Sequence, residues 1–417
     1  MNGAFEDTLH YTSPAHGGWG MVRIGMLVPE SVQLFVCPFA CGRHGAIGAM
    51  RQGFKDRLAY LYVDQNDIVR GYDDQIPGAV EELLDALPRR PRVVLIFLSC
   101  LDDLIGTDRE ALLEVLHGRF PDLRFRICHM NPISLDSKSP PPVTIRRRIY
   151  SLLEPSETKE TSVNSIGNLE AVAPECELHR VLEGLGAGEL RHISRCRTFE
   201  EFQRMASSRA NLVLAPTGVQ AAKDMERALG IPFLLLPVSY RIGEIEAGYR
   251  QLRDFLDLSG AEPDLSAERA AALVAVEAAL RAVGDRPVIV DASAVTRPFG
   301  LARALLEYGF SVRRVVAQKC IPIDRKSLDW LEENRPDVEL VQPQHHRAVR
   351  FEGRLAEALA IGVDGAYLAG ARRVVDLFAD GALFGFHGLR VLMERMRAAA
   401  EAETDLERLI ESYGLVV

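Results

Sequence analysis

Short runs of consecutive apolar residues alternate along the chain with longer stretches in which apolar residues recur every three or four positions. Residues 93–98 form the clearest apolar run and suit a strand that is buried on both faces of a sheet. Residues 76–87 before this run and 108–116 after it carry apolar side chains at helical spacing. Such an alternation of helix and strand indicates an α/β protein with parallel sheets.

Two further units with the same alternation follow. We expect strands at 210–215, 233–237, 286–291, 312–317 and 338–341, and helices at 220–229, 244–257, 267–283, 298–308, 325–334, 351–360 and 398–413. The proline-rich segment 134–144 is expected to be an irregular connection. The pattern therefore predicts three Rossmann-like domains at 1–160, 161–285 and 286–417, the last of them ending in a helix.

Composition narrows the possible partners. The chain has 417 residues and a formal net charge of −9, which argues against nucleic acid as the main partner. The longest apolar run, 93–101, is too short to cross a membrane, and no secretory signal is visible, so we expect a cytoplasmic protein. The glycine-rich Walker A motif is absent, so we do not expect this chain itself to hydrolyse ATP.

Cysteines supply the candidate chemistry. Seven cysteines are spread thinly over the chain, which is not the density of a disulfide-stabilised secreted domain. Cys37 and Cys41 follow an apolar strand at 32–36, and Cys100 follows the strand at 93–98. Open α/β sheets place their ligands at these carboxyl ends. Three thiolates facing one crevice, with a fourth position left to a partner chain, indicate an iron–sulfur cluster or a structural zinc ion.

The neighbours of the cysteine pair agree with a bulky ligand. Gly42, Gly45 and Gly48 are small, and we expect them to let backbone amides approach cluster sulfides. His44 is interpreted first as a polar turn residue and second as a hydrogen-bond donor to the cluster.

The remaining candidates have plainer interpretations. The other four cysteines are expected to be structural thiols: Cys128, Cys176, Cys196 and Cys320. Three consecutive arginines at 146–148 are interpreted as a solvated helix face, or else as a contact with an acidic substrate or partner.

Four segments resemble the nitrogenase component 1 superfamily in order and spacing. The first, DIVRGY at 67–72, is similar to the family's DIVFGG. The second, LSCLDDLIGTD at 98–108, is similar to the family's ligand cysteine followed by LIGDD. The third, VNSIGN at 163–168, is similar to VNIIGEYN, and the fourth, FGFHGLRV at 384–391, is similar to GFDGF. The superfamily includes nitrogenase subunits, cofactor scaffolds, dark-operative protochlorophyllide reductase, nickel-sirohydrochlorin reductive cyclase and methylthio-alkane reductases.

The resemblance implies three Rossmann-like domains with parallel sheets around a central cavity. It also implies a homodimer, or an α2β2 heterotetramer with a paralogous subunit, and a cluster at the subunit interface. A separate ATP-dependent iron protein would deliver the electrons. Cys100 carries over as a cluster ligand, and Cys37 and Cys41 carry over as the amino-terminal ligands. Their spacing departs from nitrogenase, where a later cysteine completes a larger cluster, so we expect a [4Fe-4S] cluster.

Two departures bear on the substrate. Ala215 and Pro216 stand where nitrogenase α has the cysteine that holds its iron–molybdenum cofactor. The histidine that also holds this cofactor has no counterpart at that place, and His387 falls a few residues later. We therefore expect a substrate other than dinitrogen, reduced by the cluster-bearing subunit of a two-component reductase. The alternatives are a scaffold on which an iron–sulfur cofactor is assembled, and an inactive paralogue or zinc-stabilised binding module.

Overall fold

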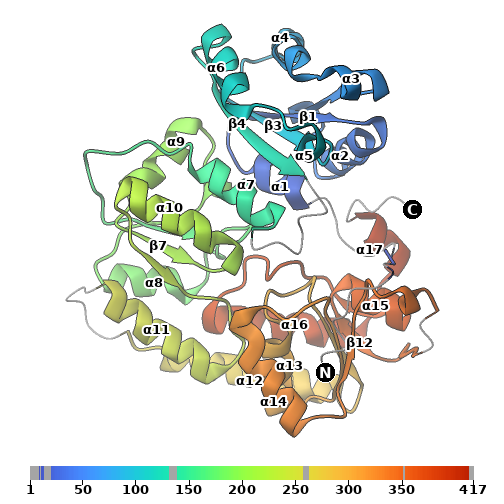
Figure 1. Cartoon of the computed structure of the whole chain (residues 1–417). Coiled ribbons are helices and arrows are strands. Elements are labelled where there is room, and N and C mark those ends of the chain that lie inside the picture. Colours follow the sequence, from blue (N-terminus) through green and yellow to red (C-terminus); the bar gives the residue numbers. More distant parts are fainter. Residues whose placement is uncertain are drawn as a thin grey trace. The chain divides into compact units, whose positions relative to one another are not determined.

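Three parallel sheets organise the chain (Figure 1). The structure, a computed structural model, describes residues 9, 11–13, 20–130, 139–256, 263–350 and 353–412. The α/β class with parallel sheets that the alternation of strand and helix predicts is confirmed. The domain boundaries near residues 160 and 285 stay a prediction.

The first sheet has the strand order β2-β1-β3-β4. Its strands are β1 Ser31–Cys37, β2 Leu58–Tyr62, β3 Val93–Ser99 and β4 Arg124–Met130. The two central strands β1 and β3 are buried along their whole length, because helices cover both faces of a parallel sheet. Even-numbered apolar residues of both strands meet α4 and α6, which cover one face (Figure 1). Their alternation follows the two-residue period of a strand.

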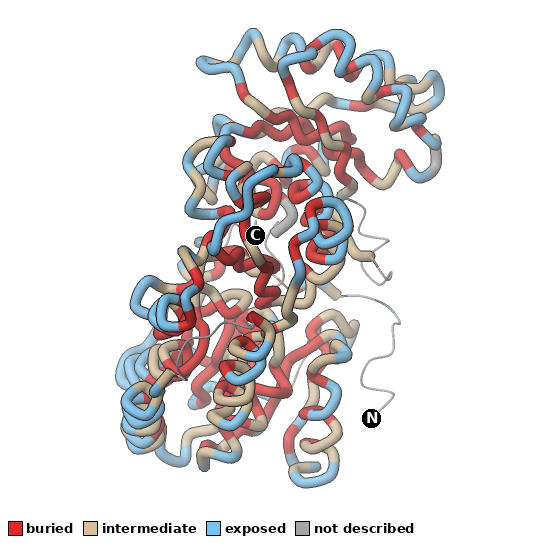
Figure 2. Tube along the Cα trace, turned by 90° about the vertical axis from the view of Figure 1, so that its left-hand side faces the viewer, coloured by how far each residue is buried: buried red, intermediate tan, exposed pale blue. Residues whose placement is uncertain are grey.

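The second and third sheets are built from shorter strands. The second has the order β6-β5-β7-β8, with β5 Val163–Ile166, β6 Leu190–Arg191, β7 Ala210–Val213 and β8 Phe233–Leu235. The third has the order β11-β10-β9-β12-β13, with β9 Val288–Asp291, β10 Val312–Val316, β11 Glu339–Val341, β12 Leu359–Ile361 and β13 Arg373–Val375. Most of these strands are buried, as the red tube in Figure 2 shows.

Helices connect the strands. Those up to the second sheet are α1 Gly20–Met26, α2 Phe39–Arg51, α3 Gln65–Arg70, α4 Ile76–Ala86, α5 Asp102–Ile105, α6 Arg109–Arg119 and α7 Pro141–Tyr150. Those that follow are α8 Glu177–Gly184, α9 Phe199–Gln203, α10 Val219–Leu229, α11 Ile242–Leu256, α12 Ser266–Val283, α13 Pro298–Glu307, α14 Arg325–Asn334, α15 Val363–Ala369, α16 Gly385–Glu401 and α17 Leu406–Ser412. No helix in the described part of the chain is long and apolar enough to cross a membrane.

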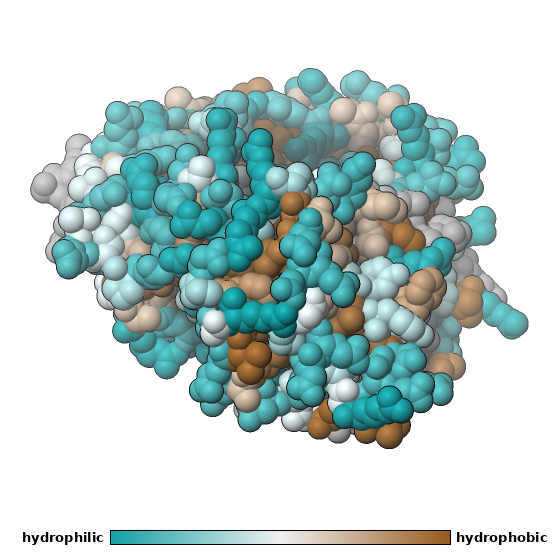
Figure 3. Space-filling view, turned by 90° about the horizontal axis from the view of Figure 1, so that it is seen from above, coloured by the Kyte–Doolittle hydropathy of each residue, from teal (hydrophilic) through white to brown (hydrophobic). Residues whose placement is uncertain are grey.

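The chain divides into two compact units. The N-terminal unit comprises Gly18–Ala171 and Arg191–Leu235, and the C-terminal unit comprises Met1–Gly17, Val172–Leu190 and Leu236–Val417. The helices α8, α11 and α12 therefore group with the third sheet, and α12 packs along α16. The face drawn in Figure 3 is mainly hydrophilic, and its apolar side chains lie in small groups.

Three predicted elements differ from the structure. The helix expected at 351–360 is wrong, because Leu359–Ile361 forms the buried strand β12 between β9 and β13. The single helix expected at 398–413 is two helices, α16 and α17, and the Asp405 side chain accepts a hydrogen bond from the Arg408 amide at the start of the second. The proline-rich connection ends earlier than expected, since α7 begins at Pro141, a position that tolerates proline. Residues 131–138 lie outside the described part of the chain.

Candidate cluster site

The strand order of the first sheet creates a topological switch point between β1 and β3. The chain continues from β1 to β2 on one side and from β3 to β4 on the other, and the carboxyl ends of β1 and β3 are where open α/β sheets place their ligands. Cys37 is the last residue of β1, and Cys100 follows the last residue of β3. The pairing of Val36 with Leu98 keeps the two strand ends level. Two of the three candidate ligands therefore lie at the same edge of one sheet.

Cys41 reaches this edge from a helix. It lies in the first turn of α2, which begins at Phe39, directly after β1. Burial, and then the neighbouring Cys41 thiol, raise the pKa of Cys37 to about 12. Burial, and then the Cys100 thiol, raise the pKa of Cys41. The Cys41 thiol therefore lies within electrostatic reach of both Cys37 and Cys100. A raised pKa favours the protonated thiol, whereas a bound metal cation favours the thiolate.

The spacing of the sulfurs separates the two metal interpretations. The three sulfurs do not all lie within 4.8 Å of one another. In a tetrahedral zinc site with zinc–sulfur bonds of about 2.3 Å, the sulfurs lie about 3.8 Å apart. A polynuclear iron–sulfur cluster holds its cysteines further apart than a single ion does. This donor set therefore fits an iron–sulfur cluster better than a mononuclear zinc ion.

The glycines beside the cysteines have a packing role that the sequence analysis missed. A Cβ atom at Gly42 would lie 2.5 Å from the ring of Tyr60. A Cβ atom at Gly45 would lie 2.6 Å from the ring of Phe35. These two residues therefore let α2 lie close against β1 and β2, which positions Cys41. The side chain of His44 lies outside what the structure describes.

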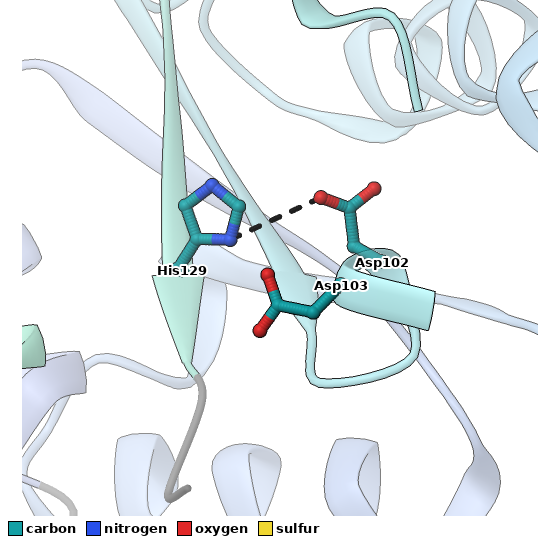
Figure 4. Close-up of side chains that lie close together, drawn as sticks. All are labelled: Asp102, Asp103 and His129. Carbon is teal, nitrogen blue, oxygen red and sulfur yellow. Dashed lines mark ion pairs between the residues drawn. The ribbon is translucent and has the colours of Figure 1, made fainter. Parts of the chain in front are cut away.

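A charged cluster follows Cys100 directly (Figure 4). Asp102 is fully buried, and its Oδ2 accepts hydrogen bonds from Nη2 and Nε of Arg109 at 3.0 and 3.2 Å. His129 Nδ1, from β4, lies 4.0 Å from the same oxygen. Ligand atoms of Asp102, Asp103 and His129 lie within 4.8 Å of one another, which is metal-like spacing. The guanidinium of Arg109 already balances the Asp102 charge, so the cluster is better explained as an ion pair.

Buried polar atoms surround this ion pair. Asp102 Oδ1, Tyr72 Oη, Thr107 Oγ1 and His129 Nε2 make no hydrogen bond within the described part of the chain. Burial, and then the Asp102 charge, raise the pKa of Tyr72 to about 12. Burial, and then Arg109, lower the pKa of His129, which keeps its ring neutral at pH 7. Buried polar groups with unused hydrogen-bonding atoms thus lie around Asp102, two residues after Cys100.

The positions that hold the cofactor in nitrogenase α differ in character here. Ala215 follows the buried strand β7, and the short turn after it begins at Pro216. Phe384 and Gly385 line a cavity of about 200 Å³ in the C-terminal unit, together with Glu244 and Arg297. These side chains offer the cavity no cysteine or histidine ligand.

Sequence reasoning missed Glu177, whose carboxylate holds the start of α16. Its Oε1 accepts hydrogen bonds from Tyr249 Oη at 2.7 Å and from the Phe386 amide at 2.6 Å. Its Oε2 accepts one from the His387 amide at 3.1 Å. A carboxylate at a helix N-terminus also interacts favourably with the helix dipole. The only sequence signal was an acidic residue at the start of α8, which is too common to identify this role.

The four remaining cysteines join no metal-like group among the described residues. Cys128 and Cys176 are buried, and burial raises the pKa of Cys128 to about 12. The Cys176 thiol contacts the Phe384 carbonyl oxygen at 3.4 Å. Cys196 and Cys320 are half-buried and belong to no metal-like group among the described residues.

Comparison with solved structures places the fold in a known class. The chain superposes on a structure titled "Nitrogenase Cp1 at pH 6.5" with a TM-score of 0.72 and 16% identity, covering 96% of each chain. It matches "Nitrogenase Cp1 at pH 5" with a TM-score of 0.63 and 14% identity, covering 91% of this chain and 87% of the other. At these identities the likeness shows the fold alone, and the fold is that of nitrogenase component 1.

The family model described as nitrogenase component 1 type oxidoreductase matches residues 18–401. The chain therefore belongs to this family, as its four motifs predict. A search of curated proteins finds no match.

Proposed function

We propose that the chain is the cluster-bearing subunit of a two-component reductase whose substrate is not dinitrogen. Its family is one of oxidoreductases, which supports a redox role. In this proposal an ATP-dependent iron protein supplies electrons, and an iron–sulfur cluster at a subunit interface receives them. The chain has no Walker A motif of its own, which agrees with ATP being used by the partner.

The observation that carries the proposal is the arrangement of thiols at the switch point of the first sheet. Cys37 and Cys100 end adjacent parallel strands, and Cys41 joins them from α2. A cluster held by these thiolates, most simply [4Fe-4S], supplies one-electron transfer when bound. The chain itself contributes three ligands and a buried strand edge that excludes water on one side, and a fourth ligand is left to a partner.

A partner subunit is supported by exposed apolar side chains near the cysteines. Phe39 in α2, Tyr62 at the end of β2 and Val69 in α3 are 57%, 54% and 87% exposed. Tyr62 pairs with Cys37 across the two strands. Apolar side chains that remain exposed around a functional site are typical of an interface. We propose a homodimer, or a heterotetramer with a paralogous subunit, that covers them.

The substrate part of the proposal depends on Ala215 and Phe384. Ala215 stands where nitrogenase α has the cofactor cysteine, and Phe384 stands where the family's PYHGFDG segment has the cofactor histidine. Neither side chain can bind a metal. The cavity beside Phe384 and Gly385 is lined by apolar groups and by the ion pair of Arg297 with Glu244, at 2.8 Å. Such a lining favours an organic molecule with polar substituents.

The first experiment is anaerobic purification with iron, sulfide and zinc analysis and electron paramagnetic resonance. We expect iron and sulfide in the wild-type protein, with both lost in Cys37→Ala, Cys41→Ala and Cys100→Ala, because each variant removes one thiolate ligand. Cys320→Ala is the matched control, since this half-buried thiol lies in the C-terminal unit and should leave the metal content unchanged. A protein that holds no iron, or that holds zinc unaffected by Cys100→Ala, contradicts the proposal.

A scaffold for cofactor assembly is the second candidate, and the absent cofactor anchors at Ala215 and Phe384 favour it. The two functions differ in what leaves the protein. A reductase subunit turns over substrate when its iron protein and ATP are supplied, whereas a scaffold transfers its metal cluster to an acceptor and forms no product. Iron transfer without product would establish the scaffold role.

A further inference from the structure

A second cavity, of about 310 Å³, lies in the N-terminal unit, and none of the three candidate ligand cysteines lines it. Its floor is formed by Ile127 and Cys128 of β4, which are buried. Its walls come from α7, which packs against both β4 and α10 (Figure 1). The polar lining groups come from α6, β4, α10, and α7 with its C-cap: Arg109, His129, Thr144, Arg147, Arg148, Ser151 and Asp224.

Positive charge dominates this lining. Three of the seven polar lining residues are arginines, and Asp224 is the only carboxylate among them. That carboxylate accepts a hydrogen bond from Arg147 Nε at 2.6 Å and also pairs with Arg227. Its single charge is therefore shared between two guanidinium groups.

Arg148 adds a charge that has no counterpart among the described residues. Its guanidinium makes no hydrogen bond or ion pair with any residue in the described ranges. Burial, and then the charge of Arg148, lower the pKa of Arg126. Arg148 also acts to lower the pKa of His129, after burial and Arg109. The cavity thus holds like charges that repel one another, an arrangement that a bound anion relieves.

The arginines are also held in place. Arg109 is fixed by the buried carboxylate of Asp102 through Nε and Nη2, which leaves Nη1 for another acceptor. Arg147 is fixed through Nε by Asp224, which leaves its two terminal nitrogens. A guanidinium group that a carboxylate of the protein already holds in place loses less conformational freedom when it binds a ligand.

The α7 helix presents the remaining donors on one face. Thr144, Arg147, Arg148 and Ser151 follow one another at three- and four-residue spacing, so they share one side of the helix. Arg146, the first arginine of the run, is instead buried and donates to the Pro142 carbonyl oxygen at 3.0 Å. Only part of the run is therefore a solvent-facing surface, and that part lines the cavity.

We infer that this cavity binds a small multivalent oxyanion, a molecule carrying two or more phosphate or carboxylate groups. Paired N–H groups of arginine match the two oxygens of either group. Its volume suits a small molecule, and the net charge of −9 disfavours a nucleic acid. The inference does not depend on a cluster at the cysteines.

The test is isothermal titration calorimetry on the full-length, anaerobically purified protein with pyrophosphate and with citrate as probes. We expect at least one probe to bind once per chain. The probe that binds identifies the group as phosphate or carboxylate. Arg148→Gln should weaken this binding roughly tenfold or more, because charge-assisted hydrogen bonds contribute free energy of that order. The probe affinity of Arg148→Lys should fall between those of the wild type and Arg148→Gln, since lysine keeps the charge and loses the paired donors.

Arg325→Gln is the matched control, because it removes the same charge from an exposed ion pair on α14 in the C-terminal unit. It should leave probe affinity unchanged. Thermal unfolding without probe should be the same for Arg148→Gln and wild type, since this guanidinium has no partner among the described residues to lose. Absence of binding by both probes, or equal weakening by Arg148→Gln and Arg325→Gln, overturns the inference.

Discussion

At the scale of single residues, the candidate ligands were predictable and their supporting neighbours were not. Cys37 and Cys100 follow long apolar strands, so their place at strand ends can be inferred from the sequence alone. Glu177 could not be found in this way, because the amide of Phe386 that it holds lies 209 positions along the chain. Contacts of this kind depend on tertiary packing, which local sequence patterns do not encode.

Replacing Glu177 tests its role at the start of α16. In Glu177→Gln an amide N–H₂ group faces a backbone N–H donor, so one acceptor is lost and two donors oppose each other. We expect the free energy of unfolding to fall by about 1–3 kcal/mol, the usual cost of leaving a buried polar group unsatisfied. Urea unfolding followed by circular dichroism measures the change.

Glu175→Gln is the control for this variant, because Glu175 is exposed two residues earlier and should leave stability within experimental error. The two variants unfolding at the same urea concentration would show that the carboxylate does not hold α16.

At the scale of elements, long strands and helices were predicted well and short buried ones were not. The predicted strand at 93–98 matches β3 to within a residue, because an apolar run of that length has one good interpretation. β12 has only three residues, Leu359–Ile361, and alanine-rich sequence before it favours a helix. Its pairing with both β9 and β13 overrides that local preference. At α7 the local sequence was also misleading. Three consecutive prolines at 140–142 suggested an irregular segment, although a helix begins at Pro141, where proline is tolerated.

The β9–β12 pair brings a buried carboxylate to the switch point of the third sheet. Asp291 ends β9 and accepts hydrogen bonds from the Ser293 and Gly365 amides, both at 2.8 Å. Burial, and then the charge of Asp364, raise the pKa of Asp291 to about 6 from 3.8. The folded state therefore binds a proton at Asp291 more tightly than the unfolded state does. Above about pH 6 the ionised Asp291 side chain lowers the free energy of unfolding, and this loss disappears as the pH falls toward 3.8.

Asp291→Asn should remove this pH dependence. The free energy of unfolding of the wild type should gain a contribution from Asp291 as pH falls through about 6. In the variant that gain should be absent. The slope of the free energy of unfolding against pH should therefore differ from the wild-type slope by up to about 1.4 kcal/mol per pH unit. Urea unfolding at several pH values above about 4.5 measures it.

This pH range excludes the titration of Glu244, whose effect on stability has the opposite sign. The pKa of Glu244 is about 2, because Arg297 and Arg241 outweigh the effect of burial, so its stabilisation is lost only as pH falls below about 4.5. Asp285→Asn is the control, since Asp285 is exposed just before β9. An unchanged slope in Asp291→Asn would mean that the buried carboxylate is already ionised or already neutral throughout this range.

At the scale of the whole molecule, the proposed function requires a second subunit beside the cysteines. Three thiols leave a four-iron cluster one ligand short, and Phe39, Tyr62 and Val69 expose apolar surface on the elements that adjoin them. The family was recognisable from sequence because four of its motifs occur in the family's order and spacing between residues 67 and 391. The residues of the proposed interface were not, because an exposed valine in a helix has no distinguishing sequence pattern.

Val69→Asp tests whether this surface is the interface. Val69 is 87% exposed in α3, so a charge there should not disturb the fold of a single chain, but it would be buried without a partner in an interface. We expect association, measured by sedimentation velocity over a range of concentrations with and without the paralogous subunit, to weaken roughly tenfold or more. Val274→Asp makes the same change at a residue that is 64% exposed on α12, and it should associate as the wild type does. If both variants associate as tightly as the wild type, the subunit interface does not include Val69, which contradicts the proposed interface at α3.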